Sequence, residues 1–410
     1  MPRITFITIG SELLRGRIVN TNATEVALCL RRYGFALDRV LSIADDRAAI
    51  QAAVTAERAQ AELVLISGGL GPTRDDITKH ALAELTGCPL RWDEGLREQL
   101  AARYAARGRE LNPLTAQQAL VPEGWTVLPN AIGTAPGLSW RQDGSWLVAM
   151  PGVPFELLHI VEHELIPRLQ QAFPAEAFAQ RVIRLHGITE SAAASRMEQL
   201  EADLLAGLEV SYLPRHDGLW IELGGRLGGV EAPHTLESAS RAVADLFADT
   251  CYARSDAPVA ALFLDACRGR GLTLAVAESL TGGQVAASLV QISGASEVFR
   301  GSVTAYDPAV KVQLLEVPAH WIQDPGVVSA PVAEAMAEGV RRLLGADIGL
   351  ATTGLAEPDG DRPAQAWIGY ADARGRGSEH TYLRYPRTVN ITRLAQQALI
   401  FALKKVQEQS

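Results

Sequence analysis

Short apolar runs alternate with longer amphipathic stretches along the first part of the chain. The runs ITFITIG (4–10), ALDRVLSI (36–43) and ELVLISGG (62–69) have strand length, and NATEVALCLRRYG (22–34) has a helical period. This alternation predicts parallel strands joined by crossover helices, which is a layered α/β domain. Because ligands bind beyond the carboxyl ends of such strands, we expect a site at the glycines that follow the third run.

The pattern changes twice further along the chain. After QQAFPAEAFAQ, three strand-like runs surround one amphipathic segment, SAAASRMEQLEADLL, which predicts a small α+β unit. From Val259 the alternation of helices and strands resumes, with one helix expected from Thr281 and a final helix from Thr392. We therefore predict an α/β protein of three domains, which span 1–170, 171–255 and 256–410.

Composition and charge exclude several classes of protein. The 410 residues carry a formal net charge of −9, which opposes broad electrostatic binding to nucleic acid or to anionic membranes. No apolar segment is long enough to span a bilayer and no leader pattern precedes the first strand, so we expect a cytoplasmic protein. The cysteines form no CxxC pair, so neither a zinc site nor a disulfide framework is predicted for Cys29, Cys88, Cys251 and Cys267.

The turn LISGGLGPTRDD (65–76) combines a flexible backbone with negative side chains. Three glycines can take positive φ and let a ligand approach the backbone: Gly68, Gly69 and Gly71. Asp75 and Asp76 repel a phosphate, but they can bind Mg²⁺, which also binds phosphate oxygens. The segment thus fits a diphosphate site with a divalent cation, and it equally fits a structural turn whose acids cap a helix beginning near Ile77.

The segment AESLTGG places Ser279 between an apolar run and a glycine-rich helix start. A serine becomes a nucleophile only when a base removes its proton, and Lys311 is the candidate base, with Tyr306 five residues before it. A partly desolvated lysine near a helix N-terminus has a lowered pKa and can act in this way, as in Ser-Lys hydrolases. The alternative is a helix-capping serine, a surface lysine and a packed tyrosine.

Several motifs carry a resemblance to one known family. IGSELLRGRIVNTN, SGGLGPTRDD, IGTAPGL and MPGVPFEL resemble, in order and spacing, the N-terminal domain of the CinA family of competence/damage-inducible proteins. AESLTGG, GSVTAYDPAVK, GVVSAPVAEAMAEG and TTGLAEPDG resemble its C-terminal domain. The resemblance covers nearly the whole chain, and it implies a molybdopterin-binding-like fold for the first domain and a KH-like fold for the middle one.

For the first domain the resemblance implies a metal-dependent ADP-ribose pyrophosphatase, which forms AMP and ribose 5-phosphate. A divalent metal, Mg²⁺ or similar, would be held by Asp75, Asp76 and Glu12. The matching substrate-binding positions are Gly68, Gly69, Gly71, Thr73, Asn20, Asn22 and Gly152. The segment LTAQQALVPEG departs from the family's NNRKQALLPEG pattern, because Ala116 and Gln117 replace basic residues that would stabilise developing negative charge during hydrolysis.

For the C-terminal domain the resemblance implies an amidase that needs no cofactor and converts nicotinamide mononucleotide to nicotinate mononucleotide and ammonia. Ser279 would attack the carboxamide, Lys311 would act as general base, and Tyr306 would relay the proton or stabilise the lysine. The substrate-binding positions would be Thr281, Gly282, Gly283 and Gly354, and the amides of the first three would form an oxyanion hole or a phosphate cradle.

The C-terminal motifs also depart from the family. Leu280 stands where AESCTGG has a cysteine, and Glu357 replaces a glycine beside a region expected to receive a phosphate-bearing substrate. Like charge there would weaken binding. In place of the family's FPGDR-like element the chain has RYPRTVN, so Arg384 and Arg387 are the candidates to replace its arginine.

The middle domain and the overall class leave alternatives open. GGRLGG, which contains Gly224, Gly225, Gly228 and Gly229, has the GXXG spacing of RNA-binding KH modules without a basic surrounding, so we expect a spacer. The expected partners are small nucleotides and a second copy of the chain in a homodimer. The rival to an enzyme is a catalytically weakened nucleotide-binding or interaction protein in competence or the DNA-damage response, and a molybdopterin-handling role rests on fold alone.

Overall fold

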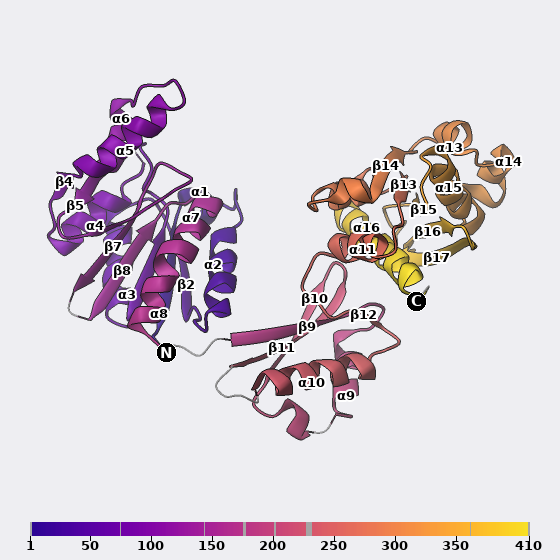
Figure 1. The fold of residues 1–410 in the computed structure, drawn as a ribbon, viewed down its shortest axis with the longest axis horizontal. Helices are drawn as coiled ribbons and strands as arrows, with labels where there is room; N and C mark the ends of the chain where they lie inside the picture. Colours follow the sequence, from indigo (N-terminus) through magenta and orange to yellow (C-terminus); the bar gives the residue numbers. More distant parts are fainter. Residues whose placement is uncertain are drawn as a thin grey trace. The chain divides into compact units, whose positions relative to one another are not determined.

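The computed structural model describes residues 2–73, 75–142, 144–174, 178–200, 202–226, 232–360 and 362–408. The chain divides into two compact units, which are Met1–Ala179 with Arg226–Ala232, and Gln180–Gly225 with Pro233–Ser410 (Figure 1). The second unit therefore contains the predicted C-terminal domain and most of the predicted middle domain, whose residues 171–179 and 226–232 belong to the first unit. Among the described residues, no helix is long and apolar enough to cross a membrane.

The first unit is built on a six-stranded sheet in the order β2-β1-β3-β8-β7-β6 (Figure 1). The four strands from β2 to β8 are parallel, as the alternation predicts, whereas β7 and β6 are antiparallel and form one edge. The short connection between β7 and β8 allows only antiparallel pairing, because a parallel crossover needs many more residues. The strands are β1 (Ile4–Ile9), β2 (Arg39–Ile43), β3 (Leu63–Ser67), β6 (Thr126–Leu128), β7 (Gly137–Gln142) and β8 (Ser145–Met150).

Helices cover both faces of this sheet, which explains why its central strands are apolar throughout. Ile4 and Phe6 of β1 face a core shared with α2, α7 and α8, and Ile7 and Ile9 face a second core shared with α3 and α4. Every residue of β1 and β3 is buried. These helices are α2 (Thr21–Arg32), α3 (Arg47–Arg58), α4 (Thr78–Thr86), α7 (Pro154–Ile160) and α8 (Ile166–Ala172).

The remaining elements of the first unit extend its edge. A two-stranded antiparallel ribbon joins β4 to β5, next to the helices α5 and α6. A single turn of 3₁₀ helix, η1, links α6 to β5. The bounds are α1 (Ser11–Leu14), β4 (Leu90–Trp92), α5 (Glu94–Ala105), α6 (Pro113–Ala116), η1 (Gln117–Ala119) and β5 (Leu120–Pro122).

The middle segment folds as the predicted small α+β unit. It has a four-stranded sheet in the order β10-β11-β9-β12, together with two helices (Figure 1). Gly224 and Gly225 lie within β11, while Gly228 and Gly229 lie outside the described residues. The elements are β9 (Phe178–Leu185), α9 (Glu190–Met197), β10 (Glu209–Arg215), β11 (Gly218–Arg226), α10 (Ala232–Leu246) and β12 (Cys251–Ala253).

The C-terminal segment is a second α/β sheet, in the order β14-β13-β15-β16-β17. Strands β14, β13 and β15 are parallel, and the hairpin of β16 and β17 adds an antiparallel edge. The strands are β13 (Leu274–Glu278), β14 (Phe299–Thr304), β15 (Ile348–Gly354), β16 (Ala364–Asp372) and β17 (Gly375–Leu383). The two sheets thus share a plan, with parallel strands from one edge through the middle and two antiparallel strands at the other edge.

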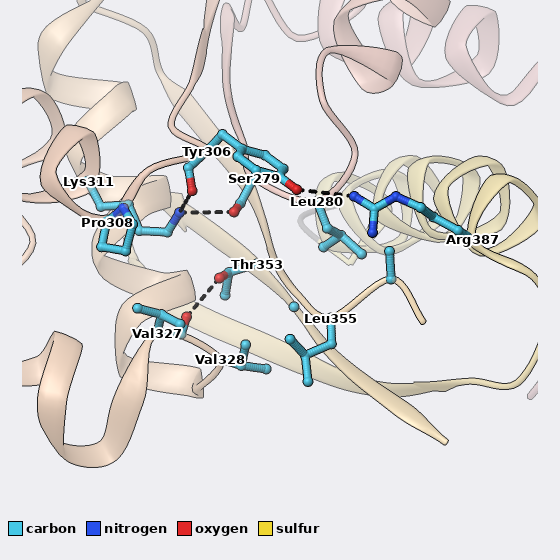
Figure 2. Close-up of a pocket in the computed structure, with 12 residues that line it drawn as sticks. Ser279, Leu280, Tyr306, Pro308, Lys311, Val327, Val328, Thr353, Leu355 and Arg387 are labelled. Atoms are coloured by element: carbon cyan, nitrogen blue, oxygen red, sulfur yellow. Dashed lines mark hydrogen bonds between the residues drawn. The ribbon is translucent and has the colours of Figure 1, made fainter. Parts of the chain in front are cut away.

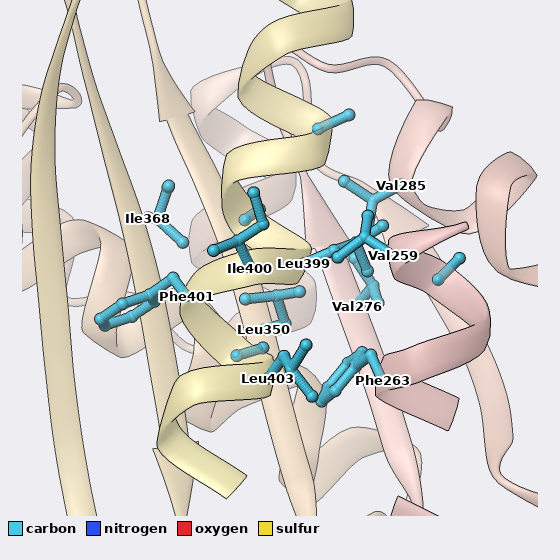
Figure 3. Packing of buried hydrophobic residues seen from close by; sticks show 14 of the residues in the cluster. Val259, Phe263, Val276, Val285, Leu350, Ile368, Leu399, Ile400, Phe401 and Leu403 are labelled. Atoms are coloured by element: carbon cyan, nitrogen blue, oxygen red, sulfur yellow. The ribbon is translucent and has the colours of Figure 1, made fainter. Parts of the chain in front are cut away.

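Helices again cover both faces of the C-terminal sheet. Figure 3 shows Leu399, Ile400 and Leu403 of α16 packed in one core with Val276 and Leu350 of the central strands. Helices α13 and α15 line the core on the other face. The bounds are α11 (Val259–Arg268), α12 (Gln284–Val290), α13 (Pro308–Leu315), α14 (Ala319–Trp321), α15 (Ala330–Leu343) and α16 (Arg387–Gln407).

Two helix starts differ from the prediction. The helix expected from Thr281 begins at Gln284, because Gly282 and Gly283 have φ angles of 61° and 105°, which no right-handed helix accepts. The final helix begins at Arg387 rather than at Thr392, directly after Pro386. The earlier start brings the Arg387 side chain to the edge of the pocket described below.

Candidate functional site

Ser279 follows β13 at the carboxyl edge of the C-terminal sheet. Its amide donates to the carbonyl of Thr352 in the neighbouring strand β15 at 3.0 Å, which fixes the backbone before the chain turns. Gly282 and Gly283 then make the turn with positive φ, a conformation that only glycine adopts without strain. The nucleophile candidate is therefore held on a rigid strand end, and it is almost entirely buried.

The buried carboxylate of Glu278 caps the helix that follows this turn. Its Oε2 accepts from the amides of Gly283 at 2.9 Å and Val285 at 3.1 Å, and its Oε1 accepts from the amide of Ala286 at 2.9 Å. The amide of Gly282 donates to the Ser279 carbonyl. The expectation that the Gly282 and Gly283 amides bind the substrate is corrected, because protein groups already occupy both.

Lys311 of α13 meets Ser279 inside the protein. Its Nζ donates to Ser279 Oγ at 2.9 Å and to the carbonyl of Ala305, and Figure 2 shows the lysine side chain reaching the serine from the opposite wall of the pocket. Only 1% of Lys311 is exposed. Burial lowers the pKa of Lys311 to about 8, and the nearby charge of Asp307 opposes this shift only in part. A substantial fraction of this amine is therefore neutral near pH 8, as a general base requires.

Tyr306 takes a different place from the one expected. The residue is 60% exposed, and its hydroxyl accepts a hydrogen bond from Arg387 at 3.1 Å (Figure 2). Only its backbone carbonyl approaches Lys311 Nζ, at 3.5 Å. The expectation that the Tyr306 hydroxyl contacts the lysine is corrected, since the side chain points to the pocket mouth.

The groups meet in a pocket of about 180 Å³ at this edge of the sheet. Arg387 at the mouth also approaches Glu357, with a distance of 3.9 Å between Nη1 and Oε1. Arg384, the other candidate arginine, does not line the pocket. Besides Ser279, Tyr306, Lys311 and Arg387, the lining residues are Leu280, Pro308, Val327, Val328, Thr353, Gly354, Leu355 and Ala356 (Figure 2).

Two of these lining residues have a clear structural reason for their identity. A Cβ on Gly354 would lie 2.6 Å from Ala366 Cα of the paired strand β16, so no larger residue fits there. Thr353 is buried, and its hydroxyl donates to the carbonyl of Val327 at 2.7 Å. The carbonyl of Val327 is thereby fixed against the end of β15, which stabilises this wall of the pocket.

The glycine turn of the first unit follows β3 at the carboxyl edge of its sheet. Gly68 and Gly69 have φ angles of 108° and 67°. A Cβ on Gly68 would lie 2.3 Å from the carbonyl oxygen of Ile9, and one on Gly69 would lie 2.1 Å from Thr78 Oγ1. Both positions therefore require glycine, because of the positive φ and because a Cβ would clash. This requirement fits a structural turn and a diphosphate site equally well.

The acids beyond this turn contact the turn itself. Asp76 Oδ2 accepts from the amide and the hydroxyl of Thr73, and it would lie 2.5 Å from a Cβ on Gly71. Asp75 is exposed, and the exposed Glu12 folds back over Gly10. Over the described ranges, no three His, Cys, Asp or Glu side chains gather as metal ligands, so the expected set of Asp75, Asp76 and Glu12 forms no three-ligand centre. Two neighbouring carboxylates still fit Mg²⁺, which usually keeps several waters and binds substrate phosphates.

The two asparagines and Gly152 hold neighbouring segments together. Asn20 caps α2 by accepting from the amide of Ala23, and its amide group donates to Thr8 Oγ1 at 2.7 Å. Asn22 donates to the carbonyl of Gly152 at 2.8 Å. A Cβ on Gly152 would lie 3.4 Å from Gly68 Cα, so this loop faces the glycine turn as expected.

Sequence reasoning did not single out three side chains that the structure brings to these sites. Glu278 caps α12, Thr353 supports the pocket wall, and Lys79 lies buried beside the glycine turn, where its Nζ donates to the carbonyl of Gln117 at 2.6 Å. Glu278 stands at the end of an otherwise apolar run, and such a position is a signal for a buried cap. Nothing in the sequence alone brings Lys79 and Gln117 together.

Comparison with known families fits this geometry. Residues 5–171 match the family described as "Probable molybdopterin binding domain", and residues 256–406 match the family described as "CinA C-terminal domain". A CinA-like protein from Salinibacter ruber is 35% identical over 399 residues, which are 96% of this chain and 97% of that protein. The chain belongs to the CinA-like protein family.

A second relative agrees with this membership, and two solved structures are similar to part of the chain. A CinA-like protein from Gemmatimonas aurantiaca is 39% identical over 366 residues, which are 88% of this chain and 85% of that one. The solved structure of "the protein CinA with unknown function" from Thermoplasma acidophilum is 33% identical and covers 42% of this chain and 96% of its own, with a TM-score of 0.37. The molybdopterin biosynthesis enzyme MoaB from a Thermus species is 20% identical, covers 42% of this chain and 94% of its own, and has a TM-score of 0.30.

The departures from the family pattern now have structural positions. Leu280 is buried and lines the pocket, so its side chain contributes packing rather than the chemistry of a thiol. Glu357 is exposed at the mouth and faces Arg387. Ala116 and Gln117 lie at the junction of α6 and η1, where the Gln117 carbonyl accepts from Lys79.

Proposed function

We propose that the C-terminal domain is an amidase that converts nicotinamide mononucleotide to nicotinate mononucleotide and ammonia. The observation that carries this proposal is the buried hydrogen bond of 2.9 Å between Lys311 Nζ and Ser279 Oγ. A nucleophile within reach of a base, both held by rigid elements, is the arrangement that covalent acyl transfer requires. The structural alternative of a solvated lysine does not apply, since Lys311 is buried.

The reaction follows from these two side chains. Ser279 Oγ bonds to the carboxamide carbon while neutral Lys311 takes the hydroxyl proton. The carbon–nitrogen bond then breaks, Lys311 gives its proton to the departing nitrogen, and ammonia leaves an acyl ester on the serine. Water enters, gives a proton to Lys311 as its oxygen bonds to the acyl carbon, and the proton returns to Ser279 as the acid departs.

The rest of the pocket fits a pyridine carboxamide with a charged tail. A volume of about 180 Å³ is below the roughly 300 Å³ at which pockets begin to enclose a drug-sized ligand, so it suits a ring while a ribose phosphate extends outward. Arg387 at the mouth supplies a positive charge that can form charge-assisted hydrogen bonds with a phosphate. The amides of Leu280 and Thr281 have no acceptor among the described residues, which leaves them available to the oxyanion.

The test is release of ammonia from nicotinamide mononucleotide by the full chain. Ser279→Ala should abolish it, and Ser288→Ala, which changes a serine of α12 outside the pocket, should not. If the wild-type protein binds the nucleotide but releases no ammonia, the protein is a nucleotide-binding or interaction protein rather than an amidase.

For the N-terminal domain we propose hydrolysis of ADP-ribose to AMP and ribose 5-phosphate. The supporting observation is the turn at Gly68 and Gly69, where backbone without side chains faces the carboxyl edge of a parallel sheet beside Asp75 and Asp76. Mg²⁺ bound by the two aspartates would neutralise phosphate charge. Release of AMP in the presence of Mg²⁺ should be lost in Asp75→Asn. It should be kept in Glu110→Gln, the control, because Glu110 is an exposed acid between α5 and α6. Equal activity of both variants would refute this role.

A further inference from the structure

Two buried polar atoms at the glycine turn have no hydrogen-bond partner. Thr78 Oγ1 and Asn22 Oδ1 belong to side chains that are 0% and 9% exposed, and neither atom has a partner among the described residues. Nearly all buried polar atoms in native proteins are paired, because an unpaired one costs roughly 1–3 kcal/mol. Two such atoms at one turn indicate a ligand that supplies their missing hydrogen-bond partners.

Both atoms belong to residues that lie directly against the turn. The amide of Thr78 donates to the carbonyl of Gly69 at 3.1 Å, and a Cβ on Gly69 would meet Thr78 Oγ1 at 2.1 Å. Asn22 donates to Ser67 Oγ at 3.2 Å, immediately before Gly68. The unpaired atoms therefore flank the backbone that a ligand would approach.

Lys79 follows Thr78 directly in the chain and adds a buried positive charge near Asp76. It lies in the first turn of α4, it is 8% exposed, and the Gln117 carbonyl is its one acceptor among the described residues. An ammonium group has three N–H donors, so two remain for another acceptor. The charge of Asp76 opposes the effect of this burial in part, and an anionic ligand would add a direct partner for the ammonium group.

Lys79 also lies against the segment in which Ala116 and Gln117 depart from the family pattern. The family pattern has basic residues there, and in this chain the carbonyl of Gln117 holds the Lys79 ammonium at 2.6 Å. The charge that the segment has lost is thus present beside the same segment, but it comes from α4. A lysine or an arginine at this place could bind phosphate oxygens, the lysine as a point charge and the arginine through two parallel hydrogen bonds.

We propose that Lys79 binds the phosphate oxygens of the diphosphate at the Gly68–Gly71 turn and replaces the cations absent from 116 and 117. This inference rests on the proposed function of the N-terminal domain as a site for ADP-ribose. The rival interpretation is that Lys79 only ties α4 to η1. In that case its loss would lower stability without changing affinity for phosphates.

The test is calorimetric titration of the full chain with inorganic pyrophosphate and with ADP-ribose, both in Mg²⁺. Lys79→Met, which keeps the length of the side chain, should weaken binding of both ligands by about tenfold or more, since a charge-assisted hydrogen bond is lost. Lys79→Arg should stay within about threefold of wild type. Arg47→Met is the matched control, because Arg47 of α3 is an exposed cation that pairs with Glu84 of α4, and it should bind as wild type does.

A second measurement, chemical labelling of lysines, uses the wild-type protein and so does not require that a variant folds. The chain has four lysines, Lys79, Lys311, Lys404 and Lys405. In the wild-type protein, pyrophosphate should protect Lys79 from an amine-reactive reagent and leave the labelling of Lys405, which pairs with Glu408 at the C-terminal helix, unchanged.

The outcomes separate this inference from the function on which it rests. Binding of pyrophosphate that depends on Lys79, without binding of ADP-ribose, supports the phosphate contact and refutes the proposed substrate. Equal binding by wild type and a folded Lys79→Met variant, or unchanged labelling of Lys79, overturns the inference while ADP-ribose hydrolysis stands. A wild-type protein that binds neither ligand overturns both.

Discussion

The pH dependence of ammonia release should report the protonation of Lys311. Only the neutral amine can accept the serine proton, so activity follows the neutral fraction of this lysine. With its pKa at about 8, that fraction is about 9% at pH 7 and about 91% at pH 9. The value of kcat/KM should therefore rise about tenfold between pH 7 and pH 9 and level off above.

Two variants of Lys311 provide the controls for this profile. Lys311→Met removes the base and should lower kcat/KM by about 10²–10⁴-fold, and the residual activity should not rise between pH 7 and pH 9. Lys311→Arg keeps a cation that stays protonated throughout, so it should not restore activity. A wild-type profile that is flat or falls from pH 7 to pH 9, or a Lys311→Met variant that keeps the rise, would refute the role of Lys311 as base.

The same pKa shift predicts how stability changes with pH. The folded protein holds Lys311 at about 8 and the unfolded chain near 10.5, so between these values the unfolded state binds more protons and stability rises with pH. The full difference is on the order of 3 kcal/mol. Lys311→Met lacks this contribution, so its unfolding free energy relative to wild type should fall by about that amount between pH 7 and pH 10.5. Urea unfolding of both proteins at the two pH values measures it, and a difference that does not change would contradict the shift.

Three further substitutions test other features of the two sites. Glu357→Gly should lower the KM for nicotinamide mononucleotide by about threefold to tenfold, because it frees Arg387 from a competing charge, and an unchanged KM would show that the pair is irrelevant. Glu278→Ala should lower the unfolding free energy by about 3 kcal/mol in urea, since three amides, two of them buried, lose their acceptor, and Glu278→Gln should lower it less. Gly69→Ala should lower the melting temperature far more than Gly87→Ala, because both glycines have a φ of 67° but only the Cβ at position 69 would clash. An equal lowering in both variants would mean that the backbone conformation alone sets the loss of stability.

The sheets were predictable because their central strands are buried on both faces. The apolar runs at 4–10 and 62–69 became β1 and β3, since helices pack on either side and leave no polar position. The start of α12 was predicted three residues too early, because amphipathic spacing does not reveal the positive φ of Gly282 and Gly283. The hairpin edges were also not evident, since periodicity shows a strand without showing the direction of its partner.

The sites were predictable only in part, for a related reason. Ser279 and Lys311 lie in motifs that resemble a family, and the structure brings their side chains within hydrogen-bond distance. The contact of Arg387 with Tyr306 joins residues 81 positions apart, and no local pattern predicts it. The same holds for Lys79, whose burial depends on how α4 packs against η1.

The two proposed functions would use a buried lysine in opposite ways. Of the four lysines in the chain, Lys79 and Lys311 are buried. Burial lowers the pKa of both to about 8, so either can be charged or neutral near that pH, which an arginine cannot. Lys311 faces a neutral hydroxyl, which leaves the amine free to lose its proton, whereas phosphate oxygens beside Lys79 would stabilise its charged form. Substrate should therefore favour the charged form of Lys79, while catalysis at Ser279 depends on the neutral form of Lys311.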